Sequence, residues 1–102
     1  MNDNHYQQNL YMKINLTITG CMGRMGQQLI KSSNKNKNFK LVSLTENFKI
    51  IRKINHILPE FNNINSFKKT NVIIDFTVPK CTLEVLKIAS KLKKRVVIGT
   101  TG

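Results

Sequence analysis

Short stretches of alternating or continuous apolar residues predict four β-strands. In Lys13–Thr19 the apolar residues Ile14, Leu16 and Ile18 alternate with polar residues, the pattern of a strand. A second strand is expected over Phe39–Thr45. The apolar centre of Asn71–Thr77 and the stretch RVVIGTTG at 95–102 predict two further, buried strands in a sheet covered on both faces.

Apolar residues at helical spacing predict two helices between these strands. Residues 24–33 carry Met25, Leu29 and Ile30 on one face, and residues 81–94 carry an apolar stripe on one side and a lysine row on the other. The stripe consists of Val85, Ile88, Ala89 and Leu92. We interpret the lysine row as a solvated face.

The segment between the second and third strands gives a weaker signal. Five apolar residues, Ile50, Ile51, Ile54, Ile57 and Leu58, follow helical spacing, so a short helix is expected before Pro59. Residues 60–70 are expected to be a loop or broken structure. The lone His56 is interpreted as a partly exposed structural residue.

The alternation of strands and helices predicts an α/β domain with a parallel sheet and helices on both faces.

Composition and charge narrow the class of protein. The 102 residues suffice for one small domain, and the net charge of +12 makes nucleic acid an obvious partner to consider. However, the 14 lysines are spread along the chain with 13 asparagines and 12 isoleucines, which indicates compositional bias. We therefore expect no primary nucleic-acid role, although a basic nucleic-acid-binding protein stays an alternative.

The sequence gives little sign of a membrane span, a secretory signal or a metal site. No apolar run approaches the roughly 18 residues of a membrane span, and the polar start does not resemble a secretory signal. Residues 1–11 are expected to be a disordered extension, with Met12 as a possible start. Cys21 and Cys81 lack metal-ligand spacing, which favours reduced thiols in a cytoplasmic protein without a metal site or membrane contact.

Three glycines follow the first predicted strand at intervals of three residues and open the first predicted helix. Gly20 would permit a tight turn, Gly23 would leave room for a pyrophosphate at the helix N-terminus, and Gly26 would let the helix pack closely on the strand. Glu46 ends the second strand 20 residues after Gly26, where it could accept hydrogen bonds from ribose hydroxyls. The pattern predicts a dinucleotide site, and a plain strand-to-helix turn with a surface glutamate is the alternative.

Three motifs together extend this interpretation. The stretches GCMGRMGQ, DFTVP and GTTG occur in this order and resemble the 4-hydroxy-tetrahydrodipicolinate reductase family, formerly dihydrodipicolinate reductase, of lysine biosynthesis in bacteria and plants. The resemblance covers residues 12–102 and is weakest over 47–70. It implies a Rossmann-type doubly wound sheet that binds NADH or NADPH and takes part in reducing a small cyclic dipicolinate precursor.

The resemblance also implies roles for individual residues. Gly20, Cys21, Met22, Gly23, Arg24 and Met25 would wrap the pyrophosphate, next to Gly26, and Glu46 would bind the adenosine ribose. Phe76, Thr77, Gly99, Thr100 and Thr101 would face the nicotinamide half. Without the resemblance, Arg24 could be an exposed basic residue on the first helical turn, and Asp75 could orient the turn that follows it.

The chain departs from the family in three respects. Residues 47–61 are rich in lysine and isoleucine, where the family usually has a loop that contains glycine and aspartate. Asn47 stands where the family often has an arginine that contacts the 2′-phosphate of NADPH, so Arg24 or Lys49 would have to supply that charge. Family members are also longer, with a C-terminal domain that binds substrate and joins a homotetramer. We therefore expect residues 12–102 to be a truncated cofactor-binding domain without catalytic residues. Another NAD(P)-dependent dehydrogenase with the same first domain is the main alternative.

Overall fold

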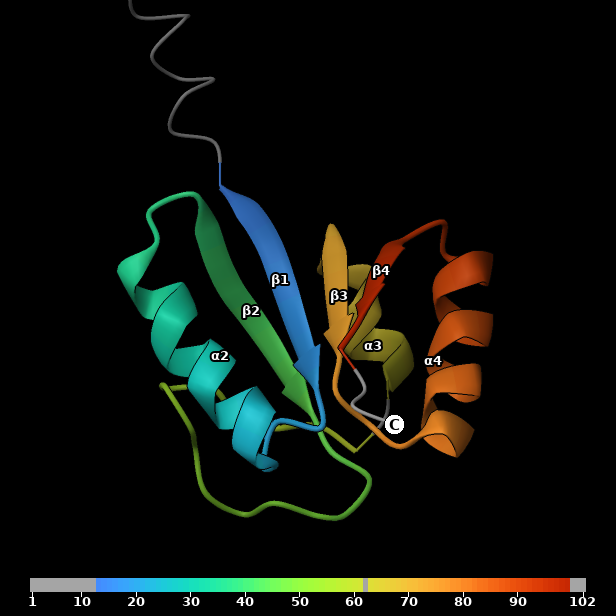
Figure 1. The fold of residues 1–102 in the computed structure, drawn as a ribbon, viewed down its shortest axis with the longest axis horizontal. Helices are drawn as coiled ribbons and strands as arrows, with labels where there is room; N and C mark the ends of the chain where they lie inside the picture. The colour runs from blue at the N-terminus through green and yellow to red at the C-terminus, as the bar shows by residue number, and fades with distance from the viewer. Residues whose placement is uncertain (1–12, 62, 100–102) are drawn as a thin grey trace, which may run out of the picture.

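The computed structural model describes residues 13–61 and 63–99, which form a parallel sheet with helices on both faces (Figure 1). The elements in chain order are β1 (Ile14–Thr19), α2 (Arg24–Lys35), β2 (Phe39–Thr45), α3 (Asn63–Lys68), β3 (Val72–Asp75), α4 (Pro79–Lys91) and β4 (Arg95–Ile98). The predicted extension 1–11 and the predicted site residues Thr100 and Thr101 lie outside the described residues.

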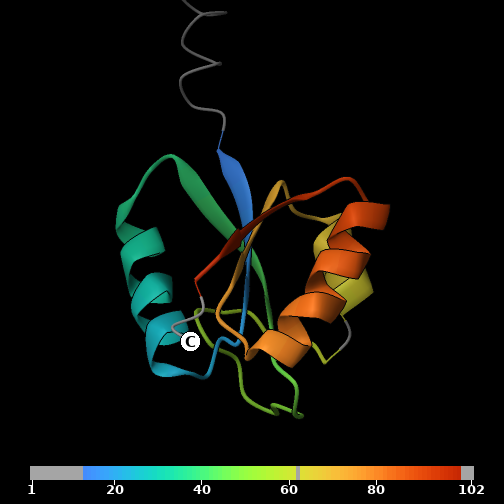
Figure 2. The same cartoon turned by 45° about the vertical axis from the view of Figure 1, so that its right-hand side comes forward.

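The strand order is β2-β1-β3-β4, and all three pairs are parallel. Helix α2 lies on one face of the sheet, and helices α3 and α4 lie on the other (Figure 2). This confirms the predicted doubly wound α/β class. The direction of winding reverses at β1, whose neighbours are β2 and β3, so a crevice is expected at the carboxyl ends of β1 and β3.

Two apolar clusters hold the helices to the sheet. On the α2 side, Ile18, Cys21, Ile30 and Leu44 are buried together. On the α4 side, the buried cluster is Phe67, Ile73, Val85 and Ala89, and Ile88 and Leu92 pack against it. The apolar stripe predicted for α4 is therefore confirmed. Among the described residues, no helix is both long enough and apolar enough to cross a membrane.

The predicted helix over residues 50–58 is wrong. Ile54 and Ile57 exchange backbone hydrogen bonds of 2.8 and 2.9 Å, and between them Asn55 and His56 have φ of +53° and +65°. Two central residues with positive φ make a tight turn of the I′ kind. Both isoleucines pack against the α2-side cluster from the ends of this turn. Apolar residues three positions apart are thus compatible with a tight turn as well as with a helix.

The segment expected to be a loop contains helix α3 instead. Its few apolar residues gave no periodic signal, but Phe67 is fully buried and anchors the helix in the α4-side cluster.

The last strand is also less buried than predicted. Within the described residues β4 pairs only with β3, and Val97 and Ile98 remain 53% and 47% exposed. An apolar strand with a free edge is open to pairing with another chain.

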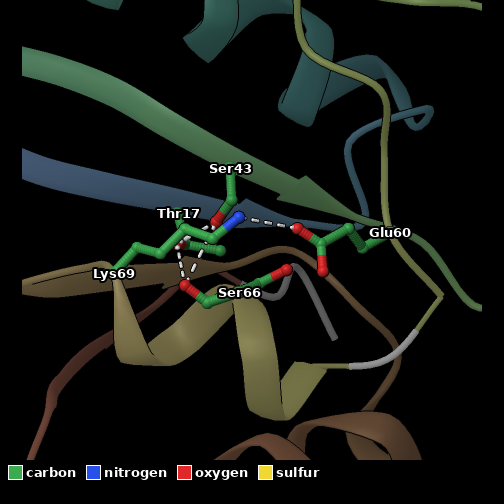
Figure 3. Close-up of polar contacts among 5 residues, drawn as sticks. All are labelled: Thr17, Ser43, Glu60, Ser66 and Lys69. Carbon is green, nitrogen blue, oxygen red and sulfur yellow. Dashed lines mark hydrogen bonds and ion pairs between the residues drawn. The ribbon is translucent and has the colours of Figure 1, made fainter.

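Buried hydroxyl groups fill the space between the sheet and α3. A register shift after Leu16 puts Thr17 opposite Ser43, and their hydroxyl oxygens lie 2.5 Å apart. Each hydroxyl also lies 3.4 Å from the carbonyl oxygen of Ser66. Figure 3 shows these three residues together. The hydroxyl of Ser66 itself is buried without a hydrogen-bond partner in the described part of the chain. A buried hydroxyl without a partner lowers stability.

We expect Ser66→Ala to raise the free energy of unfolding by about 1 kcal/mol, because it removes an unsatisfied buried hydroxyl. Ser43→Ala should lower it by about 1 kcal/mol, because the Thr17 hydroxyl then loses its bond to Ser43 and keeps only the longer one to the Ser66 carbonyl oxygen. Urea unfolding followed by circular dichroism measures both. A loss of stability in Ser66→Ala would show that this hydroxyl has a partner after all.

Candidate functional site

The glycine turn joins β1 to α2 and is tied to the end of β2. The N–H groups of Gly20 and Cys21 donate to the carbonyl oxygen of Thr45 at 3.0 and 3.2 Å. Gly23 is the N-cap of α2, no side chain of the described residues caps the helix there, and its first turn contains no acidic residue. The first N–H groups of a helix have no partner within the helix. The turn therefore presents hydrogen-bond donors and the positive end of the helix dipole.

The three glycines of the turn differ in how much room the fold leaves for a side chain. Gly20 has φ of +68°, and a Cβ there would lie 3.0 Å from the carbonyl oxygen of Phe76. A Cβ on Gly26 would lie 2.4 Å from the carbonyl oxygen of Gly20. By contrast, among the atoms of residues 13–61 and 63–99 a Cβ on Gly23 would meet only the Gly20 oxygen, at 3.4 Å, an ordinary contact. The fold itself requires Gly20 and Gly26, whereas the space at Gly23 is open.

Glu46 follows β2 and is only 8% exposed, so it is not a surface residue. Its carboxylate accepts hydrogen bonds from the N–H groups of Met22 and Asn47, both at 3.0 Å. The bond to Met22 fixes the glycine turn against the end of β2, a role that sequence reasoning missed. A carboxylate oxygen can accept more than one hydrogen bond, so this arrangement leaves acceptor capacity for a further donor.

Cys21 contributes only its backbone to the turn. The side chain is fully buried in the α2-side cluster. Burial raises the pKa of its thiol from 9.0 to about 11, and the nearby Glu46 carboxylate adds to the rise. Cys81, near the start of α4, is partly exposed. No group of three or more histidine, cysteine, aspartate or glutamate side chains in the described ranges could hold a metal ion.

Asp75 ends β3 and organises the chain around it. The buried carboxylate accepts hydrogen bonds from the hydroxyls of Thr19, Thr77 and Thr82. These threonines belong to the end of β1, the turn after β3 and the first turn of α4. The structural alternative for Asp75 is therefore confirmed, and the contributions of Thr19 and Thr82 had no recognisable sequence signal.

A groove runs along the carboxyl edge of the sheet and brings most predicted site residues together. The residues that line a cavity of about 330 Å³ include Arg24, Met25 and Gly26 from the start of α2 and Gly99 from the end of β4. A second cavity of about 230 Å³ is lined by Gly20, Glu46 and Asn47. Both cavities share the lining residues Gly23, Phe76, Thr77 and Val78. Arg24 lines the first cavity and not the one that contains Glu46.

Comparison with known proteins identifies the family. A family model described as the N-terminus of dihydrodipicolinate reductase matches residues 14–102. The chain belongs to the dihydrodipicolinate reductase family. The predicted resemblance is thereby confirmed, and the match includes every described residue of the groove.

Relatives with curated names agree with this assignment. The 4-hydroxy-tetrahydrodipicolinate reductase of Pelagibacter ubique is 72% identical over 90 residues, which cover 88% of this chain and 35% of the relative. The enzyme of the same name from Buchnera aphidicola subsp. Cinara cedri is 37% identical over 102 residues, which cover 88% and 37%. The chain thus spans about a third of the length of these family members.

Solved structures show the same arrangement of strands and helices. A dipicolinate-bound dihydrodipicolinate reductase from Paenisporosarcina sp. TG-14 superposes with a TM-score of 0.74 and 29% identity, covering 89% of this chain and 38% of that one. An aspartate semialdehyde dehydrogenase II from Vibrio cholerae superposes with a TM-score of 0.66 over 88% of this chain and 31% of that one, at 13% identity. The second likeness shows the fold alone.

We expect Cys21 to resist a thiol reagent at pH 8, because a thiol with a pKa of about 11 is almost entirely protonated and its side chain is buried. Cys81 should react first, as mass spectrometry of the labelled protein would show. Since the folded pKa exceeds the ordinary value of 9.0, this thiol favours the folded state below pH 9, and that contribution is lost as the pH rises through 11. Equal labelling of both cysteines in the folded protein would contradict this.

Proposed function

We propose that the chain is the NAD(P)H-binding part of a 4-hydroxy-tetrahydrodipicolinate reductase. The observation that carries the proposal is the open space at Gly23, beside the uncapped start of α2. A pyrophosphate at this place would accept hydrogen bonds from helix N–H groups and interact favourably with the helix dipole. Members of the family that the chain belongs to carry the reductase name.

The groove has room for the two halves of a dinucleotide on either side of Gly23. The adenosine ribose would lie in the cavity with Glu46, whose carboxylate is held in place by Met22 and Asn47. The nicotinamide half would lie in the cavity with Phe76 and Gly99. The pyrophosphate would then lie along residues 20–26, with Arg24 beside it. Thr100 and Thr101 follow Gly99 directly and stay predicted contacts of the nicotinamide half.

The bound cofactor would supply the hydride that reduces a cyclic dipicolinate precursor to tetrahydrodipicolinate. Residues of this chain would bind and orient the cofactor, and we assign none of them the role of catalytic acid. The homotetramer and the cytoplasmic location expected from the family belong to the same proposal.

We also propose that NADH is bound more tightly than NADPH. The cavity that contains Glu46 is lined by Asn47 and by no lysine or arginine among the described residues. A 2′-phosphate there would face the carboxylate of Glu46 without a cation to balance its charge. An acidic residue at this place typically bonds the ribose hydroxyls of NAD, whereas a nearby arginine accommodates the phosphate of NADP.

Gly23→Val tests the main proposal. The backbone of Gly23 is extended, with φ of −72° and ψ of 166°, so valine fits the fold but fills the space proposed for the pyrophosphate. We expect calorimetrically detectable NADH binding to disappear while the circular dichroism spectrum stays unchanged. Gly26→Val should instead lower the unfolding midpoint first, because its Cβ would overlap the Gly20 carbonyl. Normal NADH binding by Gly23→Val would refute the proposal.

Asn47→Arg tests the preference between the two cofactors. A charged hydrogen bond contributes roughly 1.5–3 kcal/mol, so NADPH affinity should rise about tenfold or more while NADH affinity changes little. Asn47→Gln is the matched control, since it lengthens the side chain without adding charge. If the wild-type chain already binds NADPH more tightly than NADH in the same calorimetric titration, the proposed preference is wrong.

A further inference from the structure

Two glycines, each just after a different strand, leave room for the same residue, Phe76. Gly20 lies after β1, and a Cβ on it would meet the backbone of Phe76, with the carbonyl oxygen at 3.0 Å and the carbonyl carbon at 3.1 Å. Gly99 lies after β4, and a Cβ on it would meet the phenyl ring instead. The nearest ring atoms would be Cε1 at 2.2 Å, Cδ1 at 2.7 Å and Cζ at 3.1 Å. The ring of Phe76 therefore rests directly on the backbone of Gly99.

A backbone hydrogen bond holds each of these two residues in the sheet. The N–H group of Phe76 donates to the carbonyl oxygen of Thr19 at 3.2 Å, and the N–H group of Gly99 donates to that of Asp75 at 2.8 Å. Both bonds continue the parallel pairing of the sheet beyond the last paired residues. We therefore expect a side chain at position 99 to displace the ring and to leave the hydrogen-bonded strands in place.

The position of the ring matters for the shape of the groove. Phe76 is a lining residue of both the 330 Å³ and the 230 Å³ cavities, and Gly99 lines the first. Carbon atoms closer than 3.0 Å repel strongly, so the ring cannot keep its place beside a Cβ at position 99. A displaced ring would change the wall of the cavity that contains Gly99.

We propose that Gly99 is a positioning residue that keeps the Phe76 ring against β4, so that the 330 Å³ cavity stays open for the nicotinamide half of the cofactor. This inference rests on the proposed function. It assigns Gly99 a role through Phe76, in addition to any contact of its own with a ligand. Phe76 lines both cavities, but Gly99 lines the first and not the one that contains Glu46, so a side chain at position 99 should affect the nicotinamide half more than the adenosine half.

A double-mutant cycle between positions 99 and 76 tests the inference, with Gly99→Ala, Phe76→Val and the double variant of the chain. Valine ends at Cγ and so removes all three ring atoms that face Gly99 while it keeps part of the apolar packing. Each protein is titrated calorimetrically with NADH and with ADP-ribose, which lacks the nicotinamide. ADP-ribose binding serves as the internal control for the adenosine half and for correct folding.

We expect Gly99→Ala to weaken NADH binding about tenfold. The nicotinamide half could enter only if the ring returned to its place beside the new Cβ, and such overpacking typically costs as much free energy as a tenfold change in affinity. ADP-ribose affinity should change less than about twofold, and in the Phe76→Val background the alanine at position 99 should have no further effect on NADH binding. Equal weakening of both ligands, or an effect on NADH that persists without the ring, would overturn the inference.

Thermal unfolding without ligand separates this inference from the proposed function. Gly99→Ala should lower the unfolding midpoint in the wild-type background and not in Phe76→Val, and an equal loss in both would show that Gly99 does not act through the ring. This comparison decides the case even if Phe76→Val alone removes measurable NADH binding. A wild-type chain that binds neither NADH nor ADP-ribose would refute the proposed function, and with it the role of the ring in binding.

Discussion

The carboxyl edge of the sheet depends on backbone contacts that leave no room for side chains. Helix α2 touches the turn at Gly26 and Gly20, and the turn touches the end of β3 at Gly20 and Phe76. These contacts stack helix, turn and strand so closely that a single Cβ would separate them. Gly23 lies within the same turn without such a contact. The close packing around it therefore creates a fixed gap at the start of the helix.

Two buried carboxylates hold the two sides of this edge in place. Glu46 bonds the glycine turn to the end of β2, and Asp75 bonds the ends of β1 and β3 to the start of α4. Because each carboxylate has several donors, neither is buried without partners. The glycine turn and the start of α4 are thus held in place before any ligand arrives, which lowers the entropic cost of binding.

Local patterns in the sequence predicted the elements but not the contacts between distant ones. Strand β2 has the predicted bounds, and the order of elements follows from the alternation of strands and helices. The turn at residues 54–57 was mistaken for a helix because both place apolar residues three apart on one side. Helix α3 was missed because, among the described residues, Phe67 is the one apolar side chain that it places in the buried α4-side cluster. The hydrogen bond from Met22 to Glu46 and the contact of the Phe76 ring with Gly99 join residues more than 20 positions apart, which no short motif could reveal.

The net positive charge of the chain and the polar groups of the groove would act on a ligand over different distances. The net charge of +12 creates a field that attracts any anion and raises the rate of encounter, but it does not select a ligand. Within the described residues, Arg24 is the one basic side chain among those that line the two cavities of the groove. Selection of a pyrophosphate would therefore depend on Arg24 and the N–H groups at the start of α2, which act over a few ångströms. Salt screens the long-range field far more than these short contacts, so we expect specificity for a ligand to depend on the turn and not on the lysines.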